Sequence, residues 1–275
     1  MDNTMKHSVS IIRSFFYTFL MLASVSMSYA SNTPIDTLMG QQKLTVDLPK
    51  QGITLSYSKS VRLEQVLSDV SVQGFGSYFP SSAQLFDLSE PSALKDKKEK
   101  TFSHLTDYAS INPEALQVKE QLSKFEFAPR QFINLDRNVV ISQLGKNPIL
   151  IGRNQMEDQK EPFNFSLYLE PRPENVQVIG VLDDVLSLPL IEHGSISDYV
   201  QLIPQGSLGK TADDSFVYVI QPDGHVKKAP YAYWNNAPTY LAPGAMIFIG
   251  FSSLPSSHSS LNQDIAELLR NKVNL

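Results

Sequence analysis

The chain has 275 residues, of which 42% are hydrophobic and 19% are charged, and its formal net charge is −5. This length suits two domains with separate cores, and the acidic balance argues against a broad basic surface for nucleic acid or anionic lipid. The sequence has no cysteine, which excludes disulfide bonds, thiol catalysis and thiolate metal sites. Its five histidines are not spaced as metal ligands, so we expect no metal site and no cofactor.

The first thirty residues have the three parts of an export signal. Lys6 and Arg13 supply positive charge, SFFYTFLMLASV is a short apolar core, and small residues stand at Ser28 and Ala30. The apolar run is shorter than the roughly 20 residues that span a membrane, so a cleaved signal is favoured over an uncleaved anchor. We therefore predict that residues 1–30 are a signal peptide, cleaved after Ala30, and that the mature protein lies outside the cytoplasm.

The mature chain begins with the pattern of a hairpin followed by a helix. Apolar residues alternate over residues 44–48 and again over 53–57, as in two half-buried strands, and the segment 49–52 supplies the turn. Ser60 is placed to cap a helix. The apolar face of this helix recurs at three- and four-residue spacing, at Leu63, Val66, Leu67 and Val70.

Two helix-favouring segments follow this unit. Ser92 opens the first, and Asn112 opens the second with Pro113 at the first helical position. A short polar loop joins them, so we predict a helical hairpin, at about residues 84–126, inserted into the first domain. FINLDRNVVISQLGKNPILIG and FSLYLEPRP then return to strands and complete a first domain over residues 42–172.

The same order of hairpin and helix returns in the second half of the chain. Alternating apolar residues on either side of Asp183–Asp184 predict two strands, and Ser195 with Asp198 has the spacing of a capping box. Asp223–Gly224 is a hairpin-turn signal between two further strands, and AMIFIGF is a last apolar strand. Two copies of one supersecondary unit predict an α+β protein with two β-grasp-like domains, the second over residues 173–252.

Residues 258–273 are predicted to form a separate amphipathic helix at the C-terminus. Ser260 and Gln263 fit a capping box. Either the second domain or a partner protein must cover the apolar stripe, and docking on the chain's own domain is favoured because short helices depend on tertiary packing. The stripe consists of Leu261, Ile265, Leu268 and Leu269.

Several stretches together resemble the GfcC-type capsule and exopolysaccharide biosynthesis proteins of Gram-negative bacteria. Near the end of the chain these are VYVIQPDGHVKKAPYAYWNN, LAPGAMIFIGF and LNQDIAELLRNKV. Upstream they are APRQFINLDRNVV, NPILIGR and FSLYLEPRP. The resemblance runs from about Leu44 to the end of the chain, and it departs in a longer polar loop before the strand FSLYLE.

The resemblance implies a periplasmic protein whose two β-grasp domains are similar to the ring-forming, SLBB-like domains of outer-membrane polysaccharide exporters. It also implies the helical insertion in the first domain and a C-terminal helix packed near the second. The family has no established enzymatic chemistry, so the implied role is a non-enzymatic accessory in polysaccharide assembly or export. Expected partners are an outer-membrane polysaccharide exporter or other capsule-assembly proteins, with an acidic polysaccharide as a further candidate and no nucleic acid.

Arg130, in APRQF, is the best single candidate for a ligand contact, and it matches an arginine of the family pattern. A guanidinium offers five donors in a planar fork that suits carboxylates, phosphates or acidic sugars. Asp136 is placed to orient it. The alternative, which we favour, is an arginine paired inside the protein with a nearby carboxylate, which holds the insertion to the sheet.

An aromatic cluster of Tyr231, Tyr233, Trp234 and Tyr240 stands near the end of the second domain. Aromatic faces stack on sugar rings, so Trp234 and Tyr233 are candidates for a polysaccharide platform. The favoured alternative is that Trp234 fills the core, since the tryptophan of a small domain is usually largely buried. We expect Tyr231 and Tyr233 to share one strand face, with Trp234 on the other.

A polysaccharide-modifying hydrolase is one alternative to the binding role, and a scaffold that binds only proteins is another. The carboxylate pairs Asp183–Asp184 and Asp213–Asp214 raise the first, but glycoside hydrolysis needs carboxylates on opposite sides of the scissile bond. Adjacent residues in turns do not supply that geometry. The sequence has no nucleophile elbow and no phosphate-binding glycine loop, so we predict no enzymatic activity and no catalytic residues.

Overall fold

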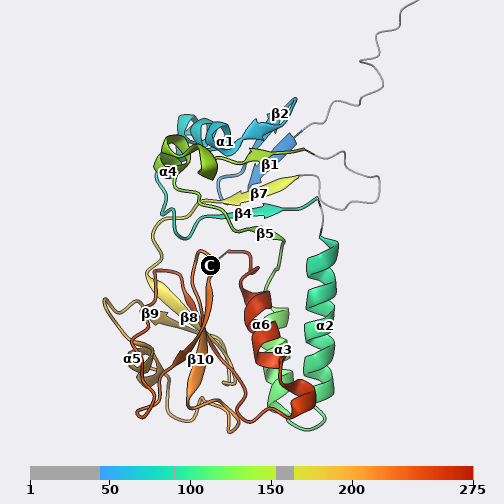
Figure 1. The fold of residues 1–275 in the computed structure, drawn as a ribbon, viewed down its shortest axis with the longest axis vertical. Helices are drawn as coiled ribbons and strands as arrows, with labels where there is room; N and C mark the ends of the chain where they lie inside the picture. The colour runs from blue at the N-terminus through green and yellow to red at the C-terminus, as the bar shows by residue number, and fades with distance from the viewer. Residues whose placement is uncertain (1–43, 90, 153–163, 275) are drawn as a thin grey trace, which may run out of the picture. The chain divides into compact units, whose positions relative to one another are not determined.

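The computed structural model describes residues 44–89, 91–152 and 164–274 (Figure 1). The predicted export signal and most of the longer polar loop, residues 153–163, lie outside the described residues. Within the described ranges, no helix has the length and apolar character needed to cross a membrane.

The first sheet has the strand order β2-β1-β7-β4-β5. β1 pairs antiparallel with β2 and parallel with β7, while β4 pairs antiparallel with β7 and β5. Helix α1 (Leu63–Val70) packs its four predicted apolar residues into the core of this sheet. The strands are β1 (Leu44–Leu48), β2 (Ile53–Tyr57), β4 (Gln84–Asp87), β5 (Arg130–Gln131) and β7 (Phe165–Tyr168).

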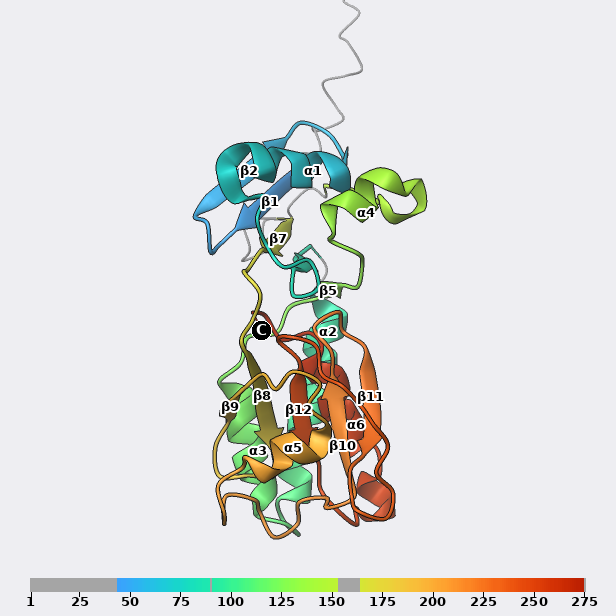
Figure 2. The ribbon, with the colours of Figure 1, turned by 90° about the vertical axis from the view of Figure 1, so that its left-hand side faces the viewer.

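The second sheet repeats this topology. Its strand order is β11-β10-β12-β8-β9. The hairpin β8–β9 lies beside the last strand, β12, which runs parallel to β8, and β10 pairs antiparallel with both β12 and β11 (Figure 2). The repeat confirms the α+β class with two β-grasp-like domains. The strands are β8 (Asn175–Gly180), β9 (Leu186–Pro189), β10 (Phe216–Ile220), β11 (Val226–Pro230) and β12 (Met246–Ile249).

Two local features of the second domain, a helix capping box and a hairpin turn, are present as predicted. Helix α5 (Ile196–Gln201) begins with the capping box, in which Asp198 Oδ2 accepts the Ser195 N–H at 2.7 Å. The turn between β10 and β11 contains Gly224 at φ 87°, a conformation that glycine adopts without steric cost.

The segment after β5 differs from its prediction. Instead of a strand, residues after Ile133 form an irregular stretch and then the short helix α4 (Arg137–Ser142). Asp136 begins this helix, because its Oδ1 accepts the N–H of Asn138 at 2.9 Å. Val140 is the buried residue of this helix, and it packs into the core of the first sheet. The 3₁₀ turn η3 (Leu144–Lys146) follows.

The start of α1 is satisfied by a distant residue and not by Ser60. Arg62 occupies the N-cap position, and Asn147 Oδ1 accepts the Glu64 N–H at 3.0 Å. Asn147 also donates to Glu64 Oε2 at 3.0 Å. The small sheet of β3 (Val61–Arg62) and β6 (Ile149–Leu150) brings these segments together, and the π-helix η2 (Ser71–Phe75) continues α1 at its other end.

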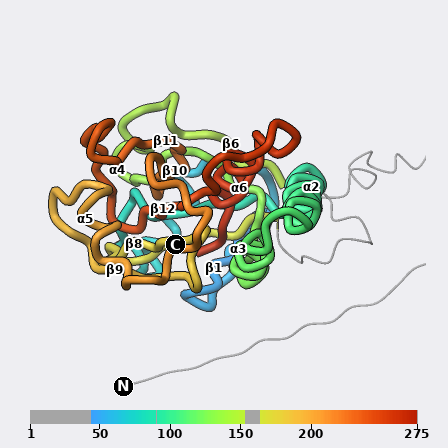
Figure 3. Tube along the Cα trace, turned by 90° about the horizontal axis from the view of Figure 1, so that it is seen from below, coloured from blue at the N-terminus to red at the C-terminus, as the bar shows by residue number. Residues whose placement is uncertain are grey.

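The helical insertion consists of α2 (Ser92–Tyr108) and α3 (Glu114–Ser123). It connects β4 to β5 of the first sheet, but its apolar side chains pack on the second sheet. The C-terminal helix α6 (Leu261–Leu269) joins the same core, after the 3₁₀ turn η4 (Ser256–His258). Figure 3 shows α2, α3 and α6 on one side of the second sheet and α5 on the other.

Docking of the C-terminal helix on the second domain is therefore confirmed, whereas its predicted capping box is wrong. Ser260 Oγ donates to Asp264 Oδ2 at 2.9 Å, and Gln263 takes no part in that contact. Leu261, Ile265 and Leu269 are fully buried, so packing and not the cap fixes this helix.

Polar contacts, in addition to its apolar face, fix α3 to the second domain. Gln121, 2% exposed, donates to the Gly180 and Leu182 carbonyls at 3.1 and 2.7 Å and accepts the Gly180 N–H at 3.0 Å. The Glu114 carboxylate accepts the N–H groups of Lys210 and Thr211 at 2.7 and 3.0 Å. It also accepts the Thr211 hydroxyl.

These contacts predict an acid-sensitive attachment of the insertion. Burial opposes ionisation of Glu114, but the hydrogen bonds from Thr211 and Lys210 outweigh it and hold the pKa of this carboxyl below its ordinary value. A lowered folded-state pKa gives stability that is present above the unfolded pKa and is lost as the pH falls through the folded value. Glu114→Gln should therefore lower Tm at pH 7 and flatten the loss of Tm below about pH 4.5.

Thermal denaturation of both proteins between pH 7 and pH 3 checks this expectation. Glu99→Gln is the matched control, because the Glu99 side chain is 67% exposed and only 3.9 Å from Lys95 in a surface ion pair. Parallel acid profiles for wild type and Glu114→Gln would contradict the assignment.

Candidate functional site

The four predicted site residues fall in two separate places. Arg130 and Asp136 line one cavity of about 390 Å³ at the edge of the first sheet. Tyr233 and Trp234 lie on the segment that follows β11 in the second domain. The two places have different chemistry, a buried cation in the first and exposed aromatic rings in the second.

A buried cation, the guanidinium of Arg130, lines the Arg130 cavity. Arg130 stands on β5, opposite Phe86 of β4, and is only 8% exposed. Its Nη2 donates to the carbonyl of Pro222 and, at 3.4 Å, to the carbonyl of Ala83. Because Pro222 belongs to the turn between β10 and β11, Arg130 links the first sheet to the second domain.

Burial lowers the pKa of Arg130 to about 10, a shift that Asp223 opposes and Arg270 reinforces. The group therefore stays charged at neutral pH. The cavity lining holds Arg130 together with Asp136 and Asp223, one cation against two carboxylates, so its charge does not favour an anionic ligand.

Asp136 lines the same cavity but does not orient Arg130. Its carboxylate caps α4, and among the described residues Arg130 makes no hydrogen bond to it. The predicted orienting contact is therefore wrong, since the chain turns into a helix at Asp136 and engages its carboxylate there. Whether Arg130 and Asp136 bind a ligand stays a prediction.

Three residues of this site were not predicted: Phe132, Asp223 and Arg270. The guanidinium carbons of Arg130 and Arg270 lie 5.6 and 4.1 Å from the Phe132 ring centroid, within cation–π range. A Cβ on Gly224 would lie 2.3 Å from that ring, so glycine is required here for space as well as for its positive φ. In the sequence, Arg130 and Phe132 stand two residues apart, which in an extended segment places both side chains on one side. Asp223 and Gly224 predict only a turn.

The aromatic loop, defined as residues 231–240, carries exposed aromatic side chains. Tyr233 is 100% exposed and Trp234 is 72% exposed, so the prediction that Trp234 fills the core is wrong. The reason is that β11 ends at Pro230, and buried rings such as Phe248 fill the interior instead.

The loop is tied down at its first residue. The hydroxyl of Tyr231 donates to the Asp213 carbonyl at 2.7 Å. The Tyr231 ring packs against the core that lies between the second sheet and α5. Burial and the charges of Asp213 and Asp214 raise the pKa of Tyr231 to about 12. Tyr231 and Tyr233 therefore do not share a face as predicted: one anchors the loop and the other points to solvent.

The carboxylate pairs serve as turn formers. Asp213 Oδ1 accepts the N–H groups of Ser215 and Phe216 at 2.9 and 3.0 Å. Asp184 accepts the N–H of Val185 at 2.9 Å and lies 3.6 Å from the Lys124 ammonium. In the ranges that the structure describes, no group of three or more His, Asp or Glu residues is placed to hold a metal ion.

Comparison with known proteins relates most of the chain to one family. The family model described as "Capsule biosynthesis GfcC, N-terminal" matches residues 40–156, and "Capsule biosynthesis GfcC C-terminal" matches residues 184–274. An Escherichia coli (strain K12) protein named "Uncharacterized protein YjbG" is 27% identical over 207 residues, covering 72% of this chain and 77% of that protein.

The geometry around Arg130 predicts a stability role that can be measured. Arg130→Ala leaves the Pro222 and Ala83 carbonyls without their donor, and we expect a loss of about 2–4 kcal/mol in the free energy of unfolding. Arg130→Lys should recover only part of this, because an ammonium lacks the planar fork. Urea denaturation checks both, with the exposed Lys100→Ala as control. Unchanged stability of Arg130→Ala would show that the guanidinium is not a structural link.

Proposed function

We propose that this chain, which belongs to the GfcC family of capsule biosynthesis proteins and so has a role in capsule assembly, is a periplasmic, non-enzymatic accessory protein. It acts by binding the polysaccharide, with an outer-membrane exporter or another assembly protein as the alternative partner. The observation that carries the binding role is the exposure of two large aromatic side chains, Tyr233 and Trp234, on one loop.

Exposed aromatic side chains of this size suggest a recognition surface. Isolated exposed apolar residues are common on proteins, but adjacent aromatic rings at 100% and 72% exposure bury little of their surface in this fold. Tyrosine and tryptophan combine a flat apolar face with a hydrogen-bonding tip, which suits contact with a sugar ring. Tyr231 holds the loop in place from the core side, so part of the ordering cost of binding is already met.

Charges of both signs lie beside the loop, and its lysines are suited to contact with an acidic polymer. Lys227 and Lys228 are exposed on β11, which is the edge strand of the second sheet and leads directly into the loop. Lys227 donates to Thr239 Oγ1 at 3.2 Å, which places its ammonium at the far end of the same loop. For a uronate or other anionic sugar bound at the loop, Lys227 supplies a cation at the Thr239 end, while the carboxylates of Asp213 and Asp214 act on Tyr231 at the other end.

A non-enzymatic role is supported by the use of the candidate carboxylates. Asp184, Asp213 and Asp214 are engaged in turns through hydrogen bonds to nearby N–H or hydroxyl groups. The predicted export signal supports the proposed periplasmic location.

The double change Tyr233→Ser with Trp234→Ser tests the binding surface. Since both side chains are exposed, we expect Tm to change little, while affinity for the purified capsular polysaccharide falls about tenfold or more. Calorimetric titration of the polymer into wild type and variant measures the affinity, and thermal denaturation measures Tm. Ile111→Ser is the matched control, because Ile111 is 63% exposed on the turn between α2 and α3.

The same wild-type and variant proteins distinguish polysaccharide binding from the two alternatives, an exporter partner and a hydrolase. Unchanged polymer binding combined with loss of an outer-membrane exporter from pull-downs would favour the exporter as partner. New reducing ends after incubation with the polymer would replace the accessory role by a hydrolase. Polymer and exporter binding that both survive the double change would refute the aromatic loop as the functional surface.

Export is tested by the mature N-terminus. Intact-mass measurement of the protein from a periplasmic extract should give a chain that begins at Ser31. A protein that retains residues 1–30, in the cytoplasmic or the membrane fraction, would contradict the predicted cleavage.

A further inference from the structure

A side chain from outside the aromatic loop, Gln221, holds the end of the loop at which Tyr240 lies. Gln221 directly follows β10 and is partly buried. Its Nε2 donates to the Tyr240 carbonyl at 2.9 Å, and its Oε1 accepts the Ala242 N–H at 3.0 Å. A glutamine side chain has the donor and the acceptor of a peptide group, so Gln221 bonds to the backbone of residues 240–242 on two sides.

The turn that carries Gln221 is itself held in place. The Gln221 N–H donates to the His225 carbonyl, and the Gln221 carbonyl accepts the Gly224 N–H, both at 2.8 Å. The next carbonyl, that of Pro222, accepts a hydrogen bond from the buried guanidinium of Arg130 on β5. Gln221 therefore reaches the aromatic loop from a base that the first sheet helps to fix.

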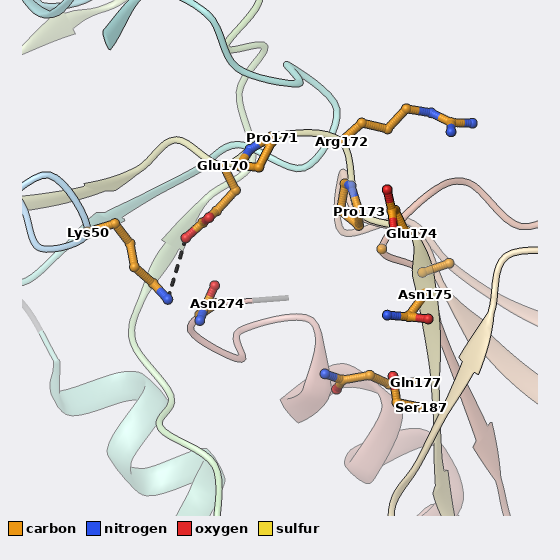
Figure 4. Close-up of a pocket in the computed structure, with 12 residues that line it drawn as sticks. Lys50, Glu170, Pro171, Arg172, Pro173, Glu174, Asn175, Gln177, Ser187 and Asn274 are labelled. Atoms are coloured by element: carbon orange, nitrogen blue, oxygen red, sulfur yellow. Dashed lines mark ion pairs between the residues drawn. The ribbon is translucent and has the colours of Figure 1, made fainter.

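The chain that follows the loop is fixed to β8. The Ala245 N–H donates to the Ala242 carbonyl at 2.9 Å, and the Ala245 carbonyl accepts the Gln177 N–H at 3.2 Å. Gly244 and Ala245 also line a polar cavity of about 350 Å³, shown in Figure 4, in which Gln177 of β8 is labelled. Through Ala242, Gln221 thus joins the end of the loop to a segment that the second sheet holds.

Two other contacts reach the same end of the loop. Tyr240 forms an isolated backbone bridge with Ser195, and the ammonium of Lys227 donates to Thr239 Oγ1 at 3.2 Å. Lys227 is an exposed side chain on a flexible stem, and its contact is with a hydroxyl group. Gln221 differs from both, because one partly buried side chain engages two backbone groups with a donor and an acceptor.

We propose that Gln221 is a positioning residue of the polysaccharide surface: it holds the Tyr240 end of the aromatic loop, so that the rings of Tyr233 and Trp234 are placed for a sugar before it binds. The inference rests on the proposed function, because the aromatic loop is the surface assigned there to the polymer. Gln221 acts through the backbone of Tyr240 and Ala242. A loop that is ordered in advance loses less entropy on binding, so loss of this amide weakens binding although both rings remain.

Gln221→Met tests the role, because methionine keeps a flexible side chain of similar length and removes the amide. Calorimetric titration with the purified capsular polysaccharide should give an affinity about fivefold to tenfold below that of wild type, since the loop must then be ordered on binding. Tm should fall by no more than about 2–4 °C, because water can replace both hydrogen bonds at these partly exposed positions. Gln65→Met is the matched control, since Gln65 donates a side-chain hydrogen bond to Asp69 at 2.8 Å on α1 of the first domain.

Fluorescence of Trp234 reports on the loop directly, because Trp234 is the one tryptophan of the sequence. Time-resolved anisotropy of the free protein should show a larger nanosecond amplitude in Gln221→Met than in wild type or Gln65→Met. A side chain that only stabilised the fold would leave this amplitude unchanged in the folded protein. Gln221→Glu keeps the acceptor for the Ala242 N–H and loses the donor to the Tyr240 carbonyl, so its amplitude should be intermediate.

Two results would overturn the inference. One is an unchanged Trp234 anisotropy in Gln221→Met, and the other is greater mobility of Trp234 combined with unchanged affinity for the polymer. If Gln221→Met does not fold, Gln221→Glu decides between the same outcomes. Failure of the proposed function is distinguishable, because wild type itself then does not bind the polymer, while the anisotropy of the free proteins still shows whether Gln221 orders the loop.

Discussion

The apolar core that the helical insertion shares with the second sheet is the constraint on which the rest of the structure depends. Leu105 of α2, Leu122 of α3 and Leu269 of α6 are fully buried in one cluster with Phe248 of β12. Each such side chain contributes about 1.5–3 kcal/mol through burial alone. A segment that belongs by sequence to the first domain thus completes the interior of the second, and the two domains cannot separate without exposing it.

Polar contacts make this shared core specific. Gln121 satisfies both the N–H and the carbonyl of Gly180, at a point where a side chain in place of glycine would collide with the backbone of Ile249. Arg130 adds a link from the first sheet to the turn at Pro222. The end of the chain adds another, because the Ala128 N–H donates to Asn271 and the Val273 N–H donates to Glu126. These contacts hold the insertion, the first sheet and the C-terminal segment to the second domain.

Features set by neighbouring residues were predictable from the sequence. The apolar spacing of α1, the capping box of α5 and the turn at Gly224 depend on residues a few positions apart, and each is present. The doubled unit then predicted both sheets. The contact of Asn147 with the start of α1 spans 83 residues, so local spacing pointed to Ser60 instead. In the same way, the alternation around Trp234 suggested a strand, although β11 ends four residues earlier, at Pro230. Of the candidate site, the sequence located Arg130 and the aromatic loop, while the contacts of Phe132 and Asp223 with this site are created only by the fold.

Native-state hydrogen exchange would test the shared core most directly. If α3 is part of the interior of the second domain, the amides of Val118 and Leu122 must open with the same free energy as those of Ile247 and Phe248 in β12. The account predicts one opening free energy for both segments, close to that of global unfolding. Exchange of the α3 amides through a separate opening of much lower free energy, with β12 still protected, would contradict it.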